Sequence, residues 1–464
     1  MFHKSTYIER RNQLKSKFKT GLLFFPGNGE SPMNYTDNTY RFRQDSSFSY
    51  FFGINKPDLF GLIDVDENQD YIFGNDFTID DIIWTGSQPK IAELSAKSGI
   101  EKTGNIQELI KRLESIINSG KTIHYLPPYR DETRLKLFRL LGIHPENAKD
   151  KASVQLIKAV ADLRNIKSDE EIIEIEKAVS ITTDMHLAAM HIIKPGLTEA
   201  KVAAKVHEVA LAAGADISFP IIATINGQTL HNHYHGNMLG KGQMFLLDAG
   251  AEIDSLYCGD LSSTMPVDLK FSSCQKDIYN IALNAHQASI SALRPGIRFM
   301  DIHILACRTI VEGLREIGIM KGDIDEAVAK GAHALFFPCG LGHMMGLDVH
   351  DMENLGEEYV GYENEAKSKM FGLKSLRMGR ELKPGFVLTI EPGIYFIPEL
   401  IDLWKANKTN IDFINFEKLE TFRNFGGIRN EENFLITENG ARLLGKSKPK
   451  TVYEVEVERE KPRI

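Results

Sequence analysis

Hydrophobic and polar positions follow two different patterns along the chain. From Gly21 to about Val160, short apolar runs typical of strands alternate with helical stretches such as 105–118, which predicts an α/β domain. The runs that we interpret as strands read GLLFFPG, SFSYFFGI, FGLIDVD and TIHYLPP. We therefore predict a first domain over residues 1–165.

A long helix opens the second part of the chain. Ser168 is followed three residues later by Glu171, which is the pattern of a capping box, and apolar residues then recur on one helical face. This helix start predicts a second domain over residues 166–464. Within it, the charged and glycine-punctuated stretch 356–382 is expected to form a long loop that covers or borders a site.

The second domain contains an imperfect internal repeat. KPGLTEAKVAAKV resembles RPGIRFMDIHILA, and KGQMFLLDAG is echoed by KPGFVLTIEPG. In the second pair a lone acid, Asp248 or Glu391, lies six positions after a glycine that opens an apolar strand. Two half-domains, each made of helix, helix and strand, would place these two acids at pseudo-symmetric positions that face each other.

Composition and charge exclude several classes of function. The net charge is -8, with 63 acidic against 55 basic residues and no basic block, so we expect no binding to nucleic acid or to a membrane surface. The four cysteines are far apart in the sequence and signal neither a disulfide framework nor a zinc knuckle. The first apolar stretch is too short for a signal peptide or a membrane span, which favours a soluble cytoplasmic protein.

Carboxylates interrupt strands that are otherwise apolar. Burying Asp248 or Glu391 is costly unless each meets a cation; the alternative is that each lies at an exposed strand end and shapes a turn. Asp260 follows Asp248 by twelve residues, a spacing that suits a hairpin, and Glu431 lies on the return strand after Glu391. Each half-domain would then supply two carboxylates from one strand pair.

Four clustered carboxylates would repel one another unless cations lay among them. His343, in GLGHMMGLDVHD, could add a nitrogen ligand. Oxygen-dominated sites with a single imidazole suit manganese, iron(II) or cobalt. Two such ions, roughly 3.5 to 4 Å apart, can turn a bridging water into hydroxide and polarise a carbonyl, so the expected reaction is hydrolysis.

Five segments resemble, in family order, the metal-site blocks of the pita-bread metallopeptidases that cleave Xaa-Pro bonds, aminopeptidase P and prolidase. These segments read LLDAGAE, GDLSSTMPV, GLGHMMGLDVHD, LTIEPGIYF and GGIRNEE. Upstream, YRFRQDSSFSYFFGINKPDLFGLIDVD resembles the amino-terminal domain of the creatinase and aminopeptidase P family. The resemblance implies an α/β N-terminal domain and an α+β pita-bread catalytic domain with a pseudo-twofold internal repeat.

The resemblance also implies roles for individual residues. Two divalent ions, most often Mn²⁺ with Co²⁺ or Fe²⁺ as alternatives, would bind Asp248, Asp260, His343, Glu391 and Glu431. Glu391 would double as the proton acceptor for a bridging water, with the bound hydroxide as nucleophile. The R-x-E order in RNEE favours Glu431 over Glu432 as the last ligand.

Two histidines and one arginine are further candidates. By resemblance His350 would contact the substrate carbonyl and stabilise the tetrahedral intermediate, and His231 would lie near the substrate. His233 and His235 compete with His231 for that role, and a solvated loop cluster is the alternative for both. Arg429 would contact the carboxylates, although a purely structural role is equally compatible with the sequence.

The chain departs from the family pattern at two points. Cys339 stands where the family often has histidine, in the pocket beyond the scissile bond, which leaves specificity there open. The spacing from Asp248 to Asp260 is one residue longer than usual, and we expect the added residue near EIDSLYC, in the turn or a bulge.

The leading functional hypothesis is a dinuclear metallopeptidase that removes the N-terminal residue from peptides with proline at position two. Proline has no amide hydrogen and a locked φ, so peptidases that bind that hydrogen cannot act on it. The alternatives are an Xaa-Pro dipeptidase and a non-catalytic pita-bread module that binds peptides or proteins. A homodimer or homotetramer is expected by analogy only.

Overall fold

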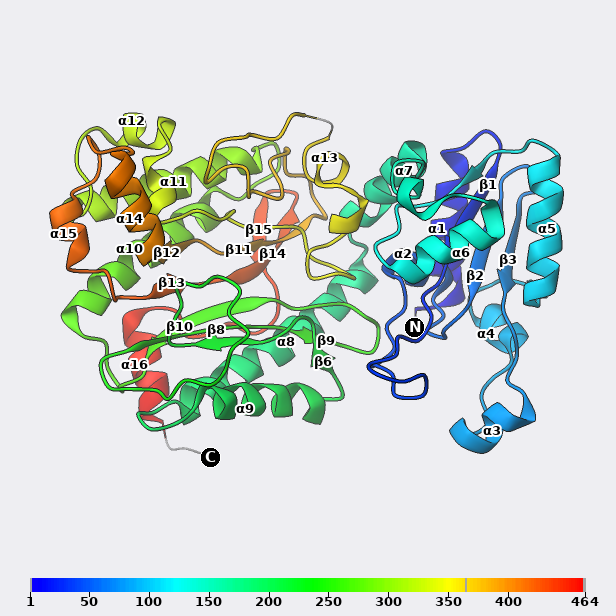
Figure 1. The fold of residues 1–464 in the computed structure, drawn as a ribbon, viewed down its shortest axis with the longest axis horizontal. Helices are drawn as coiled ribbons and strands as arrows, with labels where there is room; N and C mark the ends of the chain where they lie inside the picture. Colours follow the sequence, from blue (N-terminus) through cyan, green and yellow to red (C-terminus); the bar gives the residue numbers. More distant parts are fainter. Residues whose placement is uncertain (1, 364, 462–464) are drawn as a thin grey trace. The chain divides into compact units, whose positions relative to one another are not determined.

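The computed structural model of the chain describes residues 2–363 and 365–461. Contacts between Cα atoms divide the chain into two compact units. The first consists of residues 1–164 and 352–360, and the second of residues 165–351 and 361–464. Figure 1 shows most of the first unit in blue to cyan and the second in green to red.

A five-stranded mixed sheet forms the centre of the first unit, in the order β4-β3-β2-β1-β5. Figure 1 labels its strands β1, β2 and β3. Its strands are β1 (Leu22–Pro26), β2 (Phe60–Asp64), β3 (Gln69–Phe73), β4 (Lys102–Gly104) and β5 (Ile123–His124). Strand β1 pairs antiparallel with β2 and parallel with β5. Phe24 and Leu62 of the sheet pack with Leu109 and Leu113 of helix α5 (Ile106–Asn118) in a buried core.

Short helices complete the first unit. They are α1 (Lys4–Ser16), α2 (Ser46–Phe52), α3 (Ile79–Thr85), α4 (Ile91–Lys97), α5 (Ile106–Asn118), α6 (Asp131–Leu141), η1 (Pro145–Asn147), α7 (Val154–Asn165), η3 (Glu353–Leu355) and α13 (Glu357–Val360). The helix predicted over 105–118 is confirmed as α5.

One predicted strand of the first unit is wrong. The run SFSYFFGI forms helix α2 instead of a strand. Asp45 caps its N-terminus by accepting a hydrogen bond from the Phe48 backbone N–H at 2.8 Å, and Gly53 ends it in the left-handed conformation with φ 62°. Because nearly every side chain of α2 is buried, the run has no polar face to reveal a helical period.

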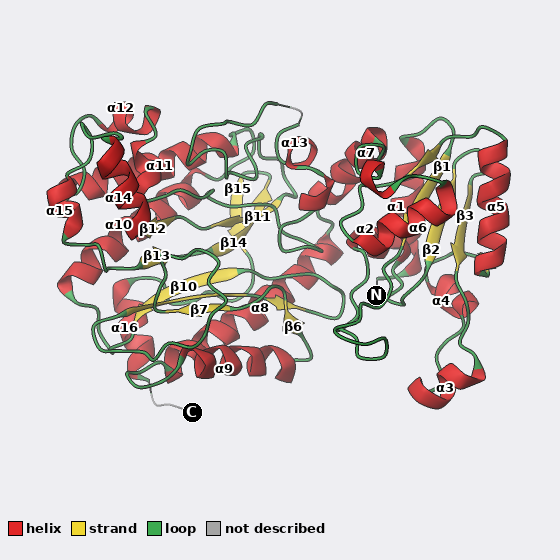
Figure 2. Cartoon of the chain, viewed as in Figure 1, coloured by secondary structure: helices red, strands yellow, loops and turns green. Residues whose placement is uncertain are grey.

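The second unit contains two layers of helices with strands between them (Figure 2). Its helices are α8 (Asp169–Ile192), α9 (Glu199–Ala212), α10 (Ser273–Ala292), α11 (Phe299–Glu316), α12 (Ile324–Ala329), η2 (Ala332–Leu335), α14 (Pro398–Asn407), α15 (Phe416–Glu420) and α16 (Val452–Glu460). Its strands are β6 (Asp216–Ile217), β7 (Ile222–Thr224), β8 (Met244–Ala249), β9 (Ala251–Glu252), β10 (Leu261–Pro266), β11 (Val387–Ile390), β12 (Gly393–Tyr395), β13 (Gly427–Arg429), β14 (Glu432–Thr437) and β15 (Gly440–Leu443).

The elements of the second unit follow the internal repeat. Helices α8 and α9 pack on the sheet β10-β8-β7. Helix α10 contacts β11 of the sheet β11-β14-β15 and packs against α11. The matching glycines have matching backbones: Gly196 and Gly296 have φ 85° and 82°, and Gly242 and Gly385 have φ 77° and 86°. The capping box predicted at the start of α8 is also present.

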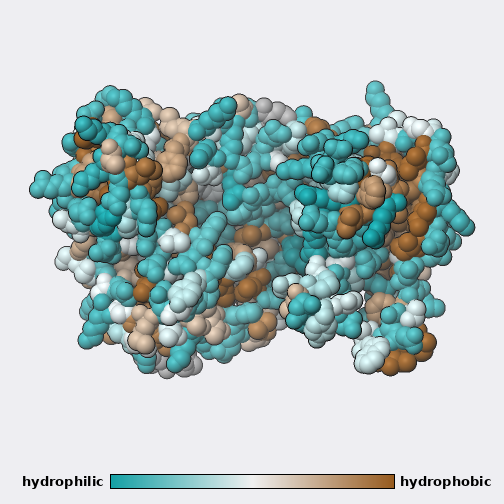
Figure 3. All heavy atoms as spheres, viewed as in Figure 1, coloured by the Kyte–Doolittle hydropathy of each residue, from teal (hydrophilic) through white to brown (hydrophobic). Residues whose placement is uncertain are grey.

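The surface is hydrophilic over most of the face seen in Figure 3, with apolar residues gathered in several places, one of them over helix α3. Ile79, Ile83 and Trp84 of that helix are 71%, 70% and 86% exposed. Within residues 2–363 and 365–461, no helix is both long enough and apolar enough to cross a bilayer.

Candidate active site

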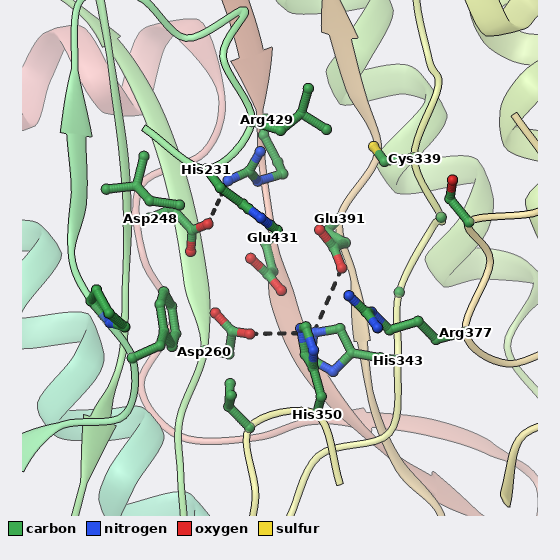
Figure 4. Close-up of a pocket in the computed structure, with 18 of the residues that line it drawn as sticks. His231, Asp248, Asp260, Cys339, His343, His350, Arg377, Glu391, Arg429 and Glu431 are labelled. Atoms are coloured by element: carbon green, nitrogen blue, oxygen red, sulfur yellow. Dashed lines mark hydrogen bonds and ion pairs between the residues drawn. The ribbon is translucent and has the colours of Figure 1, made fainter. Parts of the chain in front are cut away.

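A cavity of about 590 Å³ in the second unit collects the residues that the sequence analysis singled out. This volume is typical of small-molecule sites, which range over roughly 300 to 1,000 Å³. The candidate residues that line the cavity are His231, Asp248, Asp260, His343, His350, Glu391, Arg429 and Glu431. Figure 4 shows their side chains converging on a common centre.

The β8–β10 hairpin brings the two aspartates together. Asp248 of β8 pairs with Ser262 of β10, and Asp260 lies two residues before Ser262, so all three side chains share one face of the hairpin. The hairpin tip contains Leu256 in a left-handed conformation with φ 69°. Gly250 allows the close approach of the strands, because a Cβ there would lie 1.9 Å from the Gly259 carbonyl oxygen.

The β11–β14 pair presents the two glutamates in the same way. Ile390 pairs with Glu432, so Glu391 and Glu431 lie just beyond that pair, one after β11 and one before β14. Glu431 Oε2 accepts a hydrogen bond from the Ser262 hydroxyl at 2.8 Å and lines the cavity. Glu432 alternates away from it and forms an ion pair with Lys450 Nζ at 2.6 Å.

His343 connects the acids of the two half-domains. Its Nε2 lies 3.3 Å from Asp260 Oδ2 and 3.6 Å from Glu391 Oε1, as drawn by dashed lines in Figure 4. Its Nδ1 lies 3.0 Å from the Met344 carbonyl oxygen. A hydrogen bond from Nδ1–H to that carbonyl leaves the Nε2 lone pair directed into the site, as a metal-binding histidine requires.

The carboxylates perturb one another strongly. Burial, followed by the charges of Asp248 and Glu391, holds the pKa of Asp260 well above its usual value. Burial and the charge of Asp260 do the same to the pKa of Glu431, and burial raises the pKa of Glu391. Such a cluster is stable in its ionised form only when additional positive charge lies within it.

The donor atoms fit a metal centre. One ligand atom each from Asp260, His343 and Glu431 lie within 4.8 Å of one another, and all three residues are buried. Asp260 Oδ1 and Glu431 Oε1 are buried without a hydrogen-bond partner among the residues that the structure describes. Unpaired buried carboxylate oxygens are costly, and oxygen donors with one imidazole suit divalent ions such as manganese. The residues present therefore fit divalent ions.

Arg429 holds the aspartate side of the cavity. Its guanidinium forms an ion pair with Asp248 and donates hydrogen bonds to the Ser262 hydroxyl at 2.8 Å and the Tyr395 hydroxyl at 3.0 Å. It is 4% exposed, so these contacts are shielded from water. The contact between Arg429 and the carboxylates expected from the sequence is therefore present in the structure.

The predicted histidines lie on the wall of the cavity. His231 and His350 both line it, and the His350 ring lies 4.2 Å from the ring of His343, centroid to centroid. Burial and the charge of Arg429 lower the pKa of His231, so its ring is neutral near pH 7. His233 also lines the cavity, whereas His235 is within 3.0 Å of the Ile221 carbonyl oxygen.

Arg377 is a cavity residue that the sequence analysis missed. It comes from the stretch 356–382, which does border the site as expected, and Figure 4 shows its guanidinium pointing toward Glu391 and His350. The positive charge of Arg377 acts on groups of the cavity, since it lowers the pKa of both Glu391 and His231. From the sequence we predicted only that this loop borders the site. Nothing in the sequence distinguished Arg377 from the other basic residues of the loop.

Comparisons with known proteins agree with this geometry. Residues 174–438 match metallopeptidase family M24, and residues 7–124 match the N-terminal domain of aminopeptidase P. The human Xaa-Pro dipeptidase is 31% identical over 450 residues, spanning 94% of this chain and 88% of that protein. The Xaa-Pro aminopeptidase of Escherichia coli K12 is 30% identical over 464 residues, spanning 97% of this chain and 96% of that protein.

Solved structures are similar over the whole chain. Aminopeptidase PepP of Pseudomonas aeruginosa has a TM-score of 0.81 at 25% identity and covers 99% of this chain and 98% of its own. Zinc-substituted E. coli aminopeptidase P in complex with product has the same TM-score at 27% identity, with the same coverage.

These matches confirm the fold class predicted from the sequence, an α/β N-terminal domain followed by an α+β pita-bread catalytic domain. They also confirm the resemblance on which the functional hypothesis was based. A metallopeptidase family implies divalent metal ions, which agrees with the donor set described above. The chain belongs to metallopeptidase family M24.

Proposed function

We propose that this chain is a dinuclear metallopeptidase that hydrolyses the bond between an N-terminal residue and a following proline. The observation that carries the proposal is the set of Asp, Asp, His, Glu and Glu donors around one cavity, with unpaired carboxylate oxygens at its centre. The similarity to Xaa-Pro aminopeptidases and Xaa-Pro dipeptidases over almost the full chain supports the same substrate class.

Five residues would hold the two ions: Asp248, Asp260, His343, Glu391 and Glu431. When bound, two divalent ions would lower the pKa of a shared water and polarise the scissile carbonyl. We propose Mn²⁺ as the native metal, because the set is dominated by oxygen donors, with Co²⁺ and Fe²⁺ as alternatives.

The remaining chemistry belongs to side chains of the protein. The Glu391 side chain is 20% exposed, against 6% for Asp260, so it can meet a water in the cavity and accept its proton. His350 and the neutral ring of His231 can donate hydrogen bonds to the carbonyl oxygen as its negative charge develops. Arg429 keeps Asp248 in its orientation through the contacts described above.

Arg377 favours a second candidate, an Xaa-Pro dipeptidase. A guanidinium in the cavity wall is a suitable partner for the free carboxylate of a dipeptide, which a longer peptide does not have at that position. Arg377→Met is therefore expected to raise KM for Ala-Pro by roughly ten- to a hundredfold, since hydrogen bonds to charged groups contribute about 1.5–3 kcal/mol. KM for Ala-Pro-Ala would change less. Lys383→Met, which removes an exposed cation paired with Glu363, is the matched control.

Mass spectrometry of the products from Ala-Pro and from Ala-Pro-Ala, each incubated with the manganese-loaded protein, tests the proposal. Free alanine from the tripeptide is expected for an Xaa-Pro aminopeptidase. Release from Ala-Pro alone would instead identify a dipeptidase. Failure to cleave either peptide with metal bound would favour a non-catalytic binding module.

Several predictions from the sequence belong to the same proposal. We retain the domain division at 165/166, with residues 352–360 grouped with the first unit by their contacts. A homodimer or homotetramer and a cytoplasmic location also remain predictions, to be tested by light scattering of the purified protein and by cell fractionation.

A further inference from the structure

A second group of metal-binding side chains lies in the second unit, outside the cavity lining. It consists of His303 and Cys307 of α11 and His333 of η2, which we call the His-Cys cluster. All three residues are 0% exposed, and one ligand atom from each lies within 4.8 Å of the others. The sequence gives no motif for this cluster, because His333 follows Cys307 by 26 residues.

The distance between the two α11 side chains suits a tetrahedral metal ion. His303 Nε2 lies 3.6 Å from Cys307 Sγ. With a Zn–N bond of about 2.0 Å, a Zn–S bond of about 2.3 Å and a tetrahedral angle, the nitrogen and sulfur would be about 3.5 Å apart. Residues four apart on a helix face the same way, so α11 can present both ligands without backbone change.

Three of the four ring nitrogens of the cluster lack a hydrogen-bond partner among the described residues; the fourth, His303 Nε2, faces Cys307 Sγ. Among the residues that the structure describes, His303 Nδ1 and both ring nitrogens of His333 are buried without a hydrogen bond. Weak hydrogen bonds with backbone groups of Gly372 and Val328 raise the pKa of His303 and His333 less than burial lowers it, and they do not meet strict hydrogen-bond geometry. Buried polar atoms without partners are rare in folded proteins, and a bound ion is one of the partners that can satisfy them.

We propose that His303, Cys307 and His333 bind one Zn²⁺ ion in a site separate from the dinuclear centre. Two imidazoles and a thiolate are ligands that zinc prefers, and a fourth position remains for a water or a backbone oxygen. Binding replaces the thiol proton: the S–H bond of Cys307 breaks, a Zn–S bond forms, and the proton leaves to solvent.

The state of the side chains without metal agrees with this chemistry. Burial lowers the pKa of His303 to about 3 and the pKa of His333 to about 4, so both rings are neutral and keep a lone pair at neutral pH. Burial raises the pKa of Cys307, so its thiol stays protonated until a cation arrives. The cluster is enclosed, and Gly372 lies directly against it, since a Cβ there would be 3.1 Å from His333 Nε2. We expect the ion to enter as the chain folds.

The site would stabilise one wall of the active-site cavity. The ring of Phe337 packs against His303 at 5.3 Å between centroids, and the chain continues directly into Pro338, Cys339 and Gly340, which line the cavity. A zinc ion between α11 and η2 would fix the start of this segment. Its role is structural, because none of its ligands lines the cavity.

X-ray absorption at the zinc edge tests the proposal on full-length protein produced in zinc-supplemented medium. One sulfur ligand at about 2.3 Å is expected beside nitrogen and oxygen ligands, because the five ligands proposed for the dinuclear centre include no sulfur. A zinc spectrum with only nitrogen and oxygen ligands, or protein without zinc, would overturn the proposal. This test on the unmodified chain does not depend on whether any variant folds, or on peptidase activity.

Matched cysteine variants locate the sulfur. Cys307→Ser is expected to lose the sulfur signal and one zinc ion per chain, whereas Cys258→Ser, which changes another buried cysteine of the second unit, should keep both. A sulfur signal that survives Cys307→Ser would overturn the assignment. Zinc retained in full by a folded His333→Gln variant would do so as well.

Discussion

Asp260→Asn should stabilise the metal-free protein and at the same time remove its response to metal. The substitution keeps the shape of the side chain and removes one charge from a buried carboxylate cluster. Ligand atoms of Asp260 and Glu431 lie within 4.8 Å of each other. Two full charges at that distance repel by about 3 kcal/mol at an effective dielectric constant of about 20.

The pH dependence of this gain has a definite sign. The pKa of Asp260 in the folded, metal-free protein is raised above its ordinary value of 3.8, first by burial and then by Asp248 and Glu391. The folded state therefore keeps a proton that the unfolded state releases, and stability falls as pH rises above that ordinary value. Protonation relieves part of the repulsion, so the gain approaches the value of about 3 kcal/mol for this pair only at the alkaline end.

Differential scanning calorimetry in chelator at several pH values measures the stability of the metal-free protein. The same measurement with Mn²⁺ added gives the stabilisation by metal. A gain of about 1 kcal/mol corresponds to a rise of roughly 2–4 °C in Tm for a domain of this size. We expect the variant to melt higher than the wild type in chelator, and to gain less from Mn²⁺ and have no activity. Asp184→Asn, at an exposed ion pair with Lys446, is the control. It should change neither the Tm in chelator nor the stabilisation by Mn²⁺. A variant that melts lower in chelator yet gains as much from Mn²⁺ would refute the reasoning.

Three further outcomes follow from the same structure. His350→Ala should lower kcat by roughly 10²–10³ while metal content, measured by atomic absorption, stays the same; parallel loss of metal would show a ligand role. Stability to urea should fall as pH drops from about 6.5 toward 3, because burial lowers the pKa of His186 to about 3 and only the unfolded state takes up the proton, about 1.4 kcal/mol per unit. A folded His186→Gln variant should lower that slope by about 1.4 kcal/mol per pH unit, because His303 and His333, whose pKa values burial also lowers, contribute to the rest. An unchanged slope would show that His186 does not contribute. Gly250→Ala should abolish activity and metal binding, since its Cβ would overlap the Gly259 carbonyl oxygen; normal metal binding by that variant would contradict the hairpin geometry.

The acids of the cavity could be found from the sequence because each breaks a local rule. An ionised side chain at the end of an apolar strand, as at Asp248 and Glu391, needs a partner wherever the strand lies. Strand alternation then separates Glu431 from its neighbour Glu432, which the structure directs to Lys450. Such arguments work when the signal lies within a single strand or hairpin.

Other features depend on tertiary contacts and left no local signal. Arg377 belongs to a loop with many basic residues, and only the folded chain brings it to the cavity. The His-Cys cluster joins a helix to a distant turn, so the cysteines looked unrelated to any metal. Helix α2 was misread because its apolar and aromatic side chains are buried all around, which leaves no period by which to separate helix from strand.

Titrating metal-free protein with Mn²⁺ while measuring alanine release from Ala-Pro-Ala is the most direct test of the central claim. We predict that release is absent without metal, rises as Mn²⁺ binds and reaches its maximum when two ions are bound per chain. Full occupancy by two ions without any alanine release, or release that persists in chelator, would contradict the account.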